Sequence, residues 1–190
     1  MDENTLLDMD FQELSDSDLT VMFTIENKPV LKTRLQKITL LFEEIYDTQG
    51  PETGHSAYFF GGYSDEIDES ATTLTSAGII DETSHGYVLT AYGRKLKEYS
   101  ERCIVDDRDE AGMTIIRGVR NIVKSLNKIP DRNVVGLTYH YYQDTAVRST
   151  IKESVDILNK TAKYNGKNLS EISKAEFEDI LRKGEELHMG

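Results

Sequence analysis

The order of apolar patterns between residues 15 and 102 constrains the fold of this chain more than any other feature. Three segments carry apolar residues at the three- and four-residue spacing of an amphipathic helix. Ser15 and Ser64 stand where helix N-caps are expected, and Gly78 suits a helix end. The expected helices cover residues 15–28, 31–47 and 64–77.

A β-hairpin is expected directly after the third helix. Two short apolar runs within residues 79–89 are separated by a polar turn that contains Gly86. A fourth helix is expected over residues 90–102. Three helices followed by a hairpin is the order of a winged helix, with the third helix in the place of the recognition helix and the hairpin in the place of the wing. We therefore expect a winged-helix domain over residues 15–103.

The remaining residues flank this domain on both sides. Residues 1–14 are acidic and form an N-terminal arm, either a short helix or a loose segment. Residues 109–190 look wholly helical and could dimerise. Their expected helices cover residues 109–127, 132–143, 149–164 and 173–187. The predicted fold class is α+β, mostly α, with one β-hairpin wing followed by a C-terminal helical region.

Several short signatures in this part of the chain resemble a known family. They are Leu35-Gln36-Lys37-Ile38 with Leu41, then Tyr58, Gly61, Tyr63-Ser64, Glu66-Ile67, Leu74 and Gly78-Ile79-Ile80, then Tyr87, Leu89-Thr90, Gly93 and Leu96, and Leu137-Thr138-Tyr139. In this order they resemble the uncharacterised bacterial and archaeal YwgA-like winged-helix proteins. The resemblance implies the fold but no activity. A more distant likeness is to PadR-type regulators and to the antitoxin-associated Panacea domains, which pair a winged helix with C-terminal helices.

Composition excludes some classes of protein. No apolar run approaches the ~18 residues needed to span a bilayer, and the acidic N-terminus does not look like a signal peptide. The single cysteine, Cys103, rules out an intrachain disulfide. We therefore expect a cytoplasmic protein without membrane contact. The net charge of −12 disfavours unspecific nucleic-acid binding by the whole surface.

No pattern of residues predicts catalysis. The four histidines (His55, His85, His140 and His188) are isolated in the sequence and lack the spacing of a metal site. Cys103 has no base nearby in the sequence and is interpreted as a buried structural residue. We expect no catalytic residue, no metal and no cofactor.

The outward face of the third helix is unusual for a DNA reader. It carries three carboxylates and no cation, and its residues are Asp65, Asp68, Glu69, Thr72 and Ser76. The hairpin adds Asp81 and Glu82. Carboxylates read bases only when nearby cations hold the phosphates. The second helix offers modest compensation as possible nucleic-acid or partner contacts, through Lys32, Arg34 and Lys37.

A cationic stripe is expected on the helix after Asp109. Arg117, Arg120, Lys124 and Lys128 lie opposite the apolar stripe of that helix. The stripe is either a solvated face, a contact for a nucleic-acid backbone, or a dock for a carboxylate-rich surface. The acidic N-terminal half of the same or a partner protomer, with a net charge of −8 over residues 1–54, could supply that surface.

Two further features concern packing. The tyrosine-rich run from Tyr139 to Tyr142 is interpreted as core or interface packing, with stacking on unpaired bases as the alternative. The apolar seam of Ile151, Val155, Leu158 and Ala162 suits association between helices, which predicts a homodimer through the C-terminal helices.

Two functions remain open at this point. The first is a transcription-regulator-like protein that contacts nucleic acid through the cationic stripe. The alternative is a protein–protein interaction module, antitoxin-like or a scaffold, whose winged helix does not read DNA.

Overall fold

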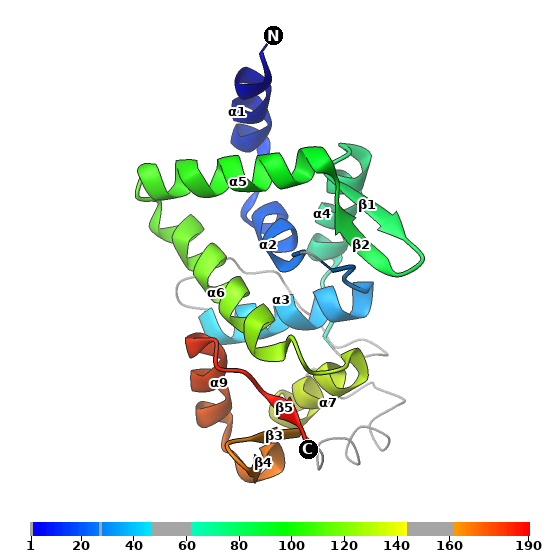
Figure 1. Cartoon of the computed structure of the whole chain (residues 1–190), viewed down its shortest axis with the longest axis vertical. Helices are drawn as coiled ribbons and strands as arrows, with labels where there is room; N and C mark the ends of the chain where they lie inside the picture. Colours follow the sequence, from blue (N-terminus) through cyan, green and yellow to red (C-terminus); the bar gives the residue numbers. More distant parts are fainter. Residues whose placement is uncertain (1, 27, 47–61, 144–161) are drawn as a thin grey trace.

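The computed structural model describes residues 2–26, 28–46, 62–143 and 162–190. The described part is mostly helical and carries two small antiparallel sheets (Figure 1). The first half contains α1 (Glu3–Glu13), α2 (Asp16–Thr24), α3 (Lys32–Tyr46), α4 (Asp65–Ser76), β1 (Ile80–Thr83), β2 (Gly86–Leu89) and α5 (Ala91–Asp106). The second half contains α6 (Glu110–Leu126), α7 (Asp131–Tyr141), β3 (Ala162–Tyr164), β4 (Lys167–Asn168), the 3₁₀ helix η2 (Leu169–Glu171), α9 (Lys174–Lys183) and β5 (His188–Met189).

Two helices of the first half, α2 and α4, begin at the caps that the sequence predicts. Ser15 and Asp18 form a capping box at the start of α2, in which each side chain bonds the backbone N–H of the other residue. Ser64 caps α4 and Thr90 caps α5. Gly78, with φ +70°, directs the chain from α4 into β1. The expected order of helices and hairpin in residues 15–102 is confirmed.

The hairpin is tied to the linker between α2 and α3. β1 and β2 pair antiparallel, with Ile80 opposite Leu89 and Thr83 opposite Gly86. On the other edge of β2, Val30 and Tyr87 exchange two backbone hydrogen bonds of 2.9 Å. The hairpin therefore has a fixed position against the linker that precedes α3.

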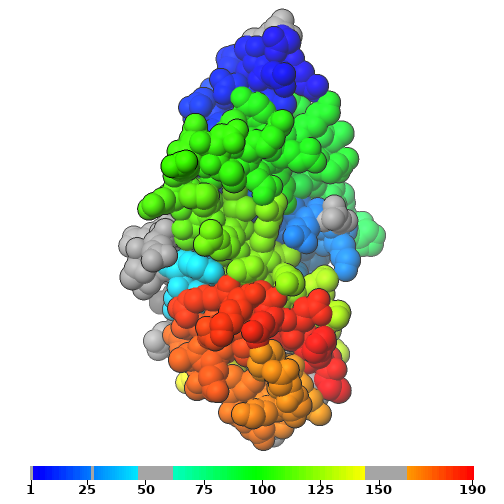
Figure 2. Space-filling model, turned by 60° about the vertical axis from the view of Figure 1, so that its left-hand side comes forward, coloured from blue at the N-terminus to red at the C-terminus, as the bar shows by residue number. Residues whose placement is uncertain are grey.

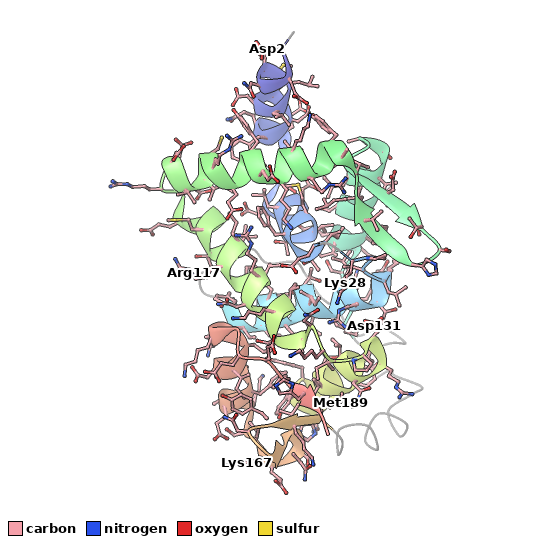
Figure 3. The ribbon with its side chains drawn as sticks, viewed as in Figure 1. Asp2, Lys28, Arg117, Asp131, Lys167 and Met189 are labelled. Atoms are coloured by element: carbon pink, nitrogen blue, oxygen red, sulfur yellow. The ribbon has the colours of Figure 1, made fainter. Side chains whose placement is uncertain are left out.

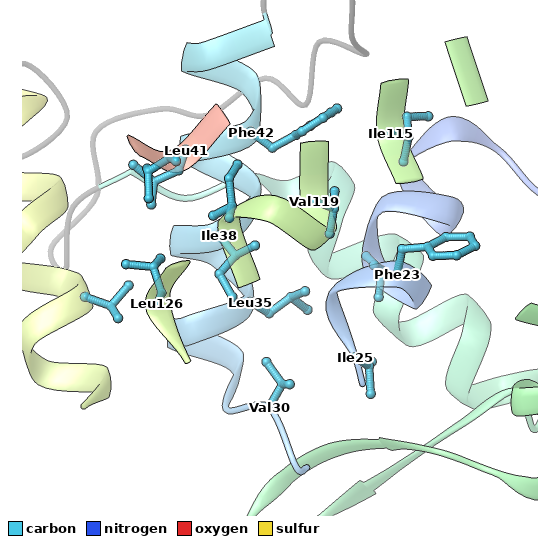
Figure 4. Packing of buried hydrophobic residues seen from close by; sticks show 14 of the residues in the cluster. Phe23, Ile25, Val30, Leu35, Ile38, Leu41, Phe42, Ile115, Val119 and Leu126 are labelled. Atoms are coloured by element: carbon cyan, nitrogen blue, oxygen red, sulfur yellow. The ribbon is translucent and has the colours of Figure 1, made fainter. Parts of the chain in front are cut away.

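One apolar core joins the two halves of the described chain. α6 packs against both α2 and α3, and α7 packs against α3. Figure 4 shows Phe23 from α2, Phe42 from α3, and Ile115 and Val119 from α6 within this core. All four side chains are fully buried. The predicted apolar stripe of α6 is thus confirmed as its packing face.

The N-terminal arm is a helix. Asp2 accepts a hydrogen bond from the backbone of Thr5 and caps α1. α1 packs on α5, where Leu7 is buried and Phe11 lies edge-on to Tyr99. α1 stands at one end of the molecule, across the outer side of α5 (Figure 1).

The expectation that the second half is wholly helical was wrong. β3 pairs with β4 and with β5 to give a three-stranded antiparallel sheet in the order β4-β3-β5. The physical reason is the pair Asn165-Gly166, whose φ values of +48° and +79° reverse the chain in two residues. Residues 162–164, expected at the end of a helix, are therefore strand, and residues 149–161 lie outside the described chain.

Other helix ends differ from the prediction by a few residues. α5 continues to Asp106, so that Cys103 lies inside a helix and is half-buried rather than buried. α9 ends at Gly184, which has φ +66°, and does not reach Leu187. In the part of the chain that the structure describes, no helix is both long and apolar enough to cross a membrane.

Candidate interaction surfaces

The outward face of α4 lies where the sequence predicts it. Ile67, Ala71 and Leu74 are buried against the core. Asp65, Glu69, Thr72 and Ser76 are exposed on the other side, and the Asp68 side chain keeps 32% of its surface exposed. The position of this face follows from the 3.6-residue period of the helix.

This face offers oxygen acceptors rather than donors. The hydroxyl of Thr72 donates to the Asp68 carbonyl at 2.9 Å, and the hydroxyl of Ser76 donates to the Thr72 carbonyl at 2.9 Å. Their protons are therefore engaged within the helix, and the carboxylates of Asp65 and Glu69 are acceptors only. A phosphate backbone needs donors and positive charge, and this face supplies neither.

The cation closest to this face is neutralised by it. Lys32, at the start of α3, forms an ion pair with Asp68 and lies over the ring of Tyr63 at 5.6 Å. Burial alone would lower the pKa of Lys32, but hydrogen bonds with Asp68 and Tyr63 outweigh it and raise that pKa. Burial likewise opposes ionisation of Asp68, yet the bonds from Lys32 and Tyr63 hold its pKa below the ordinary value. Lys32, expected as a possible contact, is therefore already paired with a carboxylate of this face, although half of its side chain stays exposed.

Arg34 and Lys37 are not surface contacts. The Arg34 side chain is only 15% exposed and donates to the carbonyls of Ile129 at 2.9 Å and Leu126 at 2.7 Å, and to Asp131 at 2.8 Å. Lys37 is 2% exposed, and its ammonium donates to the Gly62 carbonyl at 2.9 Å. The expectation for these two residues was wrong because α6 and α7 cover this side of α3.

The hairpin adds no positive charge beside α4. Asp81 and Glu82 are exposed on β1, and His85 is exposed in the turn. The hydroxyl of Thr83 donates to the Gly86 carbonyl at 2.7 Å, so it closes the turn. α4 and the hairpin together therefore form an acidic surface, which we call the α4–hairpin face and define by Asp65, Asp68, Glu69, Thr72, Ser76, Asp81 and Glu82.

Arg117, Arg120 and Lys124 lie on the solvent side of α6, whereas Lys128 lies beyond the end of the helix at Leu126, and half of this charge is neutralised. Figure 2 shows α6 at the surface between α5 above it and α9 below it. Arg120 binds Glu101 of α5, with one hydrogen bond of 2.7 Å, and Lys128 binds Glu186 at 2.6 Å. The hydrogen bond with Glu101 raises the pKa of Arg120, and the one from Lys128 lowers the pKa of Glu186. These carboxylates come from α5 and from the segment after α9.

Arg117 and Lys124 complete the stripe. Both are exposed, and neither makes an ion pair within the described residues. Figure 3 labels Arg117, which points outward from the middle of α6. The stripe thus retains two cations on α6 that form no ion pair within the described chain. In the described chain, no ion pair joins the stripe to the acidic residues of 1–54, which were expected as an internal dock.

The tyrosine-rich run packs inside the protein, which confirms the first interpretation of it. Tyr139, Tyr141 and Tyr142 are at least 92% buried. The Tyr141 ring stacks on Phe177 at 4.1 Å, and its hydroxyl donates to the Leu169 carbonyl at 2.6 Å. Since the rings are covered, they do not provide a stacking platform for bases.

The described residues do not assemble a metal centre: no three of their histidine, cysteine, aspartate and glutamate side chains are grouped to hold an ion. Comparison with known proteins adds no assignment, because no family model, no curated protein and no solved structure matches the chain. The candidate surfaces are therefore judged on their own chemistry.

Sequence reasoning missed the partners of the cations. The helical period placed Arg120 and Lys128 on the outer side of α6, but Glu101 and Glu186 lie 19 and 58 residues away in the sequence. No local signal pairs residues across such distances. For Arg34 and Lys37 a signal was present, because they precede Ile38 and Leu41 by four residues and so lie on the same side of α3.

Proposed function

We propose that residues 15–103 form a winged helix. The order α2, α3, α4, β1, β2 supports this, as does the packing of α2 against both α3 and α4. The bridge between Val30 and Tyr87 holds the hairpin against the linker between the first two helices, so that the hairpin projects as a wing beside α4. α4 would then be the helix that a DNA reader inserts into the major groove.

Within this fold, we propose a non-enzymatic protein-interaction module whose winged helix does not read DNA. The observation that carries the proposal is the acceptor-only chemistry of the α4–hairpin face, where Lys32 is already bound to Asp68. Such a face repels a phosphate backbone and attracts a protein surface rich in lysine and arginine. The partner class that fits is a basic protein surface.

Charge reversal on α4 tests this proposal. Full-length chain is used as bait in three forms: wild type, Asp65→Lys/Glu69→Lys, and the matched control Asp106→Lys/Asp107→Lys. All four positions are exposed, and the control adds the same charge at the C-terminal end of α5, where cations suit the helix dipole. We expect a protein that the wild type and control retain and the α4 variant loses, with retention that weakens as salt rises.

A captured protein is then purified, and it must bind the wild type and the control more tightly than it binds the α4 variant. Equal retention of every protein by the α4 variant and the control would contradict the proposal. Circular dichroism of all three forms verifies that the helices persist in each bait.

A second candidate function is contact with a nucleic-acid backbone through α6. Arg117 and Lys124 favour it, because both are exposed and form no ion pair in the described part of the chain. Binding of duplex DNA that falls steeply with salt, and that Arg117→Gln/Lys124→Gln removes, would support this candidate.

The assembly and the compartment are also proposals. We infer a homodimer through the C-terminal helices, although Ile151, Val155 and Leu158 of the predicted seam lie outside the described residues. Ala162, the last residue of that seam, is buried in β3. We further infer that the protein acts in the cytoplasm, because its single cysteine suits a reducing compartment.

A further inference from the structure

A cavity of about 380 Å³ lies where the α2–α3 linker meets the end of α6 and the start of α7. Its volume falls within the range of small-molecule sites. Lys28 and Asp131, labelled in Figure 3, stand on different walls of it. The walls are formed by Thr24, Glu26, Lys28, Pro29, Val30, Arg34, Ile38, Val123, Asn127 and Asp131.

Part of the cavity wall is aliphatic. Val30 comes from the linker, Ile38 from α3 and Val123 from α6. Val30 and Ile38 are at least 93% buried, so the apolar surface open to a ligand comes mainly from Pro29, which is exposed, and Val123, which is half-buried. An aliphatic or aromatic group on a ligand would be shielded from water there, which favours its binding.

Two cations of the cavity have unused hydrogen-bond donors. Arg34 has five N–H groups, of which its bonds to Leu126, Ile129 and Asp131 use three. Lys28 makes only a long contact of 3.4 Å with the Asn127 amide oxygen, and it forms no ion pair with any described residue. A carboxylate on the ligand is the group that suits these donors.

A carboxylate of the protein lies in the same cavity. Glu26 is exposed and forms no ion pair within the described chain. Asp131, by contrast, is held by Arg34 at 2.8 Å. Glu26 can therefore accept hydrogen bonds from the ammonium group of a ligand, and Lys28 and Arg34 of the same cavity can donate to its carboxylate.

We propose that this cavity binds a free α-amino acid with an apolar side chain. Such a molecule carries an ammonium, a carboxylate and an apolar group, and each has a counterpart in the cavity. The site goes beyond the interaction function proposed above, and its test does not depend on that function. Because Val30 lines the cavity and also pairs with Tyr87, the bound amino acid contacts the segment that fixes the hairpin.

Calorimetric titration of the full chain with L-leucine and with L-phenylalanine tests the proposal. We expect at least one of them to bind saturably with a Kd of about 1 mM or tighter. For leucine, two analogues separate the charges: isocaproate lacks the ammonium, and isoamylamine lacks the carboxylate. Each should bind roughly tenfold more weakly than leucine, because one charged hydrogen-bonding group of the site stays unpaired. If phenylalanine is the ligand, hydrocinnamate and phenethylamine take their place.

Substitutions in the cavity complete the test. Lys28→Gln and Glu26→Gln should each weaken binding by about fivefold or more. The matched control Lys124→Gln, on the outer face of α6, should bind as the wild type does. Absence of saturable binding by both amino acids at about 10 mM would overturn the proposal. Binding that neither cavity substitution weakens would overturn it as well.

Discussion

Lys37 is a charged residue inside the core. Its ammonium donates to the Gly62 carbonyl at 2.9 Å and lies 5.8 Å from the centre of the Tyr139 ring. No carboxylate of the described chain forms an ion pair with it. Burial lowers the pKa of Lys37 to about 8, because the charged form loses its hydration.

The pH dependence of stability follows from that pKa. The unfolded chain holds the proton of Lys37 up to its ordinary pKa of 10.5, whereas the folded protein releases it at about 8. Between these values the unfolded chain binds more protons, so this residue makes the free energy of unfolding rise with pH. Below about pH 8 Lys37 is charged in the folded protein, and the burial of that charge lowers the free energy of unfolding by its full amount.

Lys37→Met removes this titration. Between neutral pH and about pH 10.5, the free energy of unfolding of the wild type should increase relative to that of Lys37→Met by up to about 3 kcal/mol. Urea unfolding at a series of pH values measures the difference, with Lys124→Met as the exposed control. A difference between wild type and Lys37→Met that does not change with pH would contradict the buried position of this ammonium.

The contact between Gly86 and the α2–α3 linker is an element-scale feature that one side chain can break. Gly86 has φ +115°, and a Cβ atom there would lie 2.4 Å from the carbonyl oxygen of Val30. Gly78 also has a positive φ of +70°, but a Cβ atom there meets nothing within 4 Å. Substitution of Gly78 therefore tests backbone strain alone, whereas substitution of Gly86 tests strain together with the packing of the hairpin on the linker.

We expect Gly86→Ala to lower the free energy of unfolding by roughly 3 kcal/mol or more, since it combines strain with the loss of the pairing between Val30 and Tyr87. Gly78→Ala should cost only about 1–2 kcal/mol. Chemical denaturation of both variants gives the comparison. Equal costs for the two substitutions would mean that the hairpin is not held by the linker.

The pair of Arg120 and Glu101 joins α6 to α5. Both side chains are partly exposed, at 40% and 34%, so solvent weakens their attraction. A double-mutant cycle with Arg120→Gln and Glu101→Gln should give a coupling energy of roughly 1 kcal/mol. Lys124→Gln, one helical turn further along α6, should change stability by less than about 0.5 kcal/mol. A coupling energy near zero would mean that Glu101 does not hold Arg120, so that Arg120 would be a cation available to a ligand.

Local signals in the sequence predicted most elements of this fold. Ser15 and Ser64 cap helices where expected, and the hairpin follows from the turn at Gly86. The sheet of β3, β4 and β5 was not predicted, although Asn165-Gly166 is a strong hairpin signal. Its strands have two or three residues, too few to show an alternating pattern.

The candidate surfaces were predictable only in part. The acidic character of the α4–hairpin face follows directly from helical period and sequence. The loss of Lys32, Arg34 and Lys37 as free cations depends on contacts with α4, α6 and α7, and three-dimensional packing determines those contacts. The cavity beside Lys28 likewise forms only when the linker meets α6 and α7.

On the scale of the whole molecule, charge separates the surfaces. The α4–hairpin face carries Asp65, Glu69, Asp81 and Glu82, all exposed. The α6 stripe keeps Arg117 and Lys124 uncompensated within the described chain, while Arg120 and Lys128 bind carboxylates. In a protein of net charge −12, this arrangement disfavours the approach of a nucleic acid to α4 and the hairpin.

Duplex binding tests this account most directly. Fluorescence anisotropy of a labelled mixed-sequence DNA duplex is measured against the wild-type chain over a range of salt, including about 150 mM. Arg117→Gln/Lys124→Gln and Asp65→Asn/Glu69→Gln are measured in parallel. The account predicts no saturable binding by the wild type near physiological salt. Saturable binding that falls steeply with salt, survives Arg117→Gln/Lys124→Gln and changes with Asp65→Asn/Glu69→Gln would contradict it, because α4 would then be reading DNA.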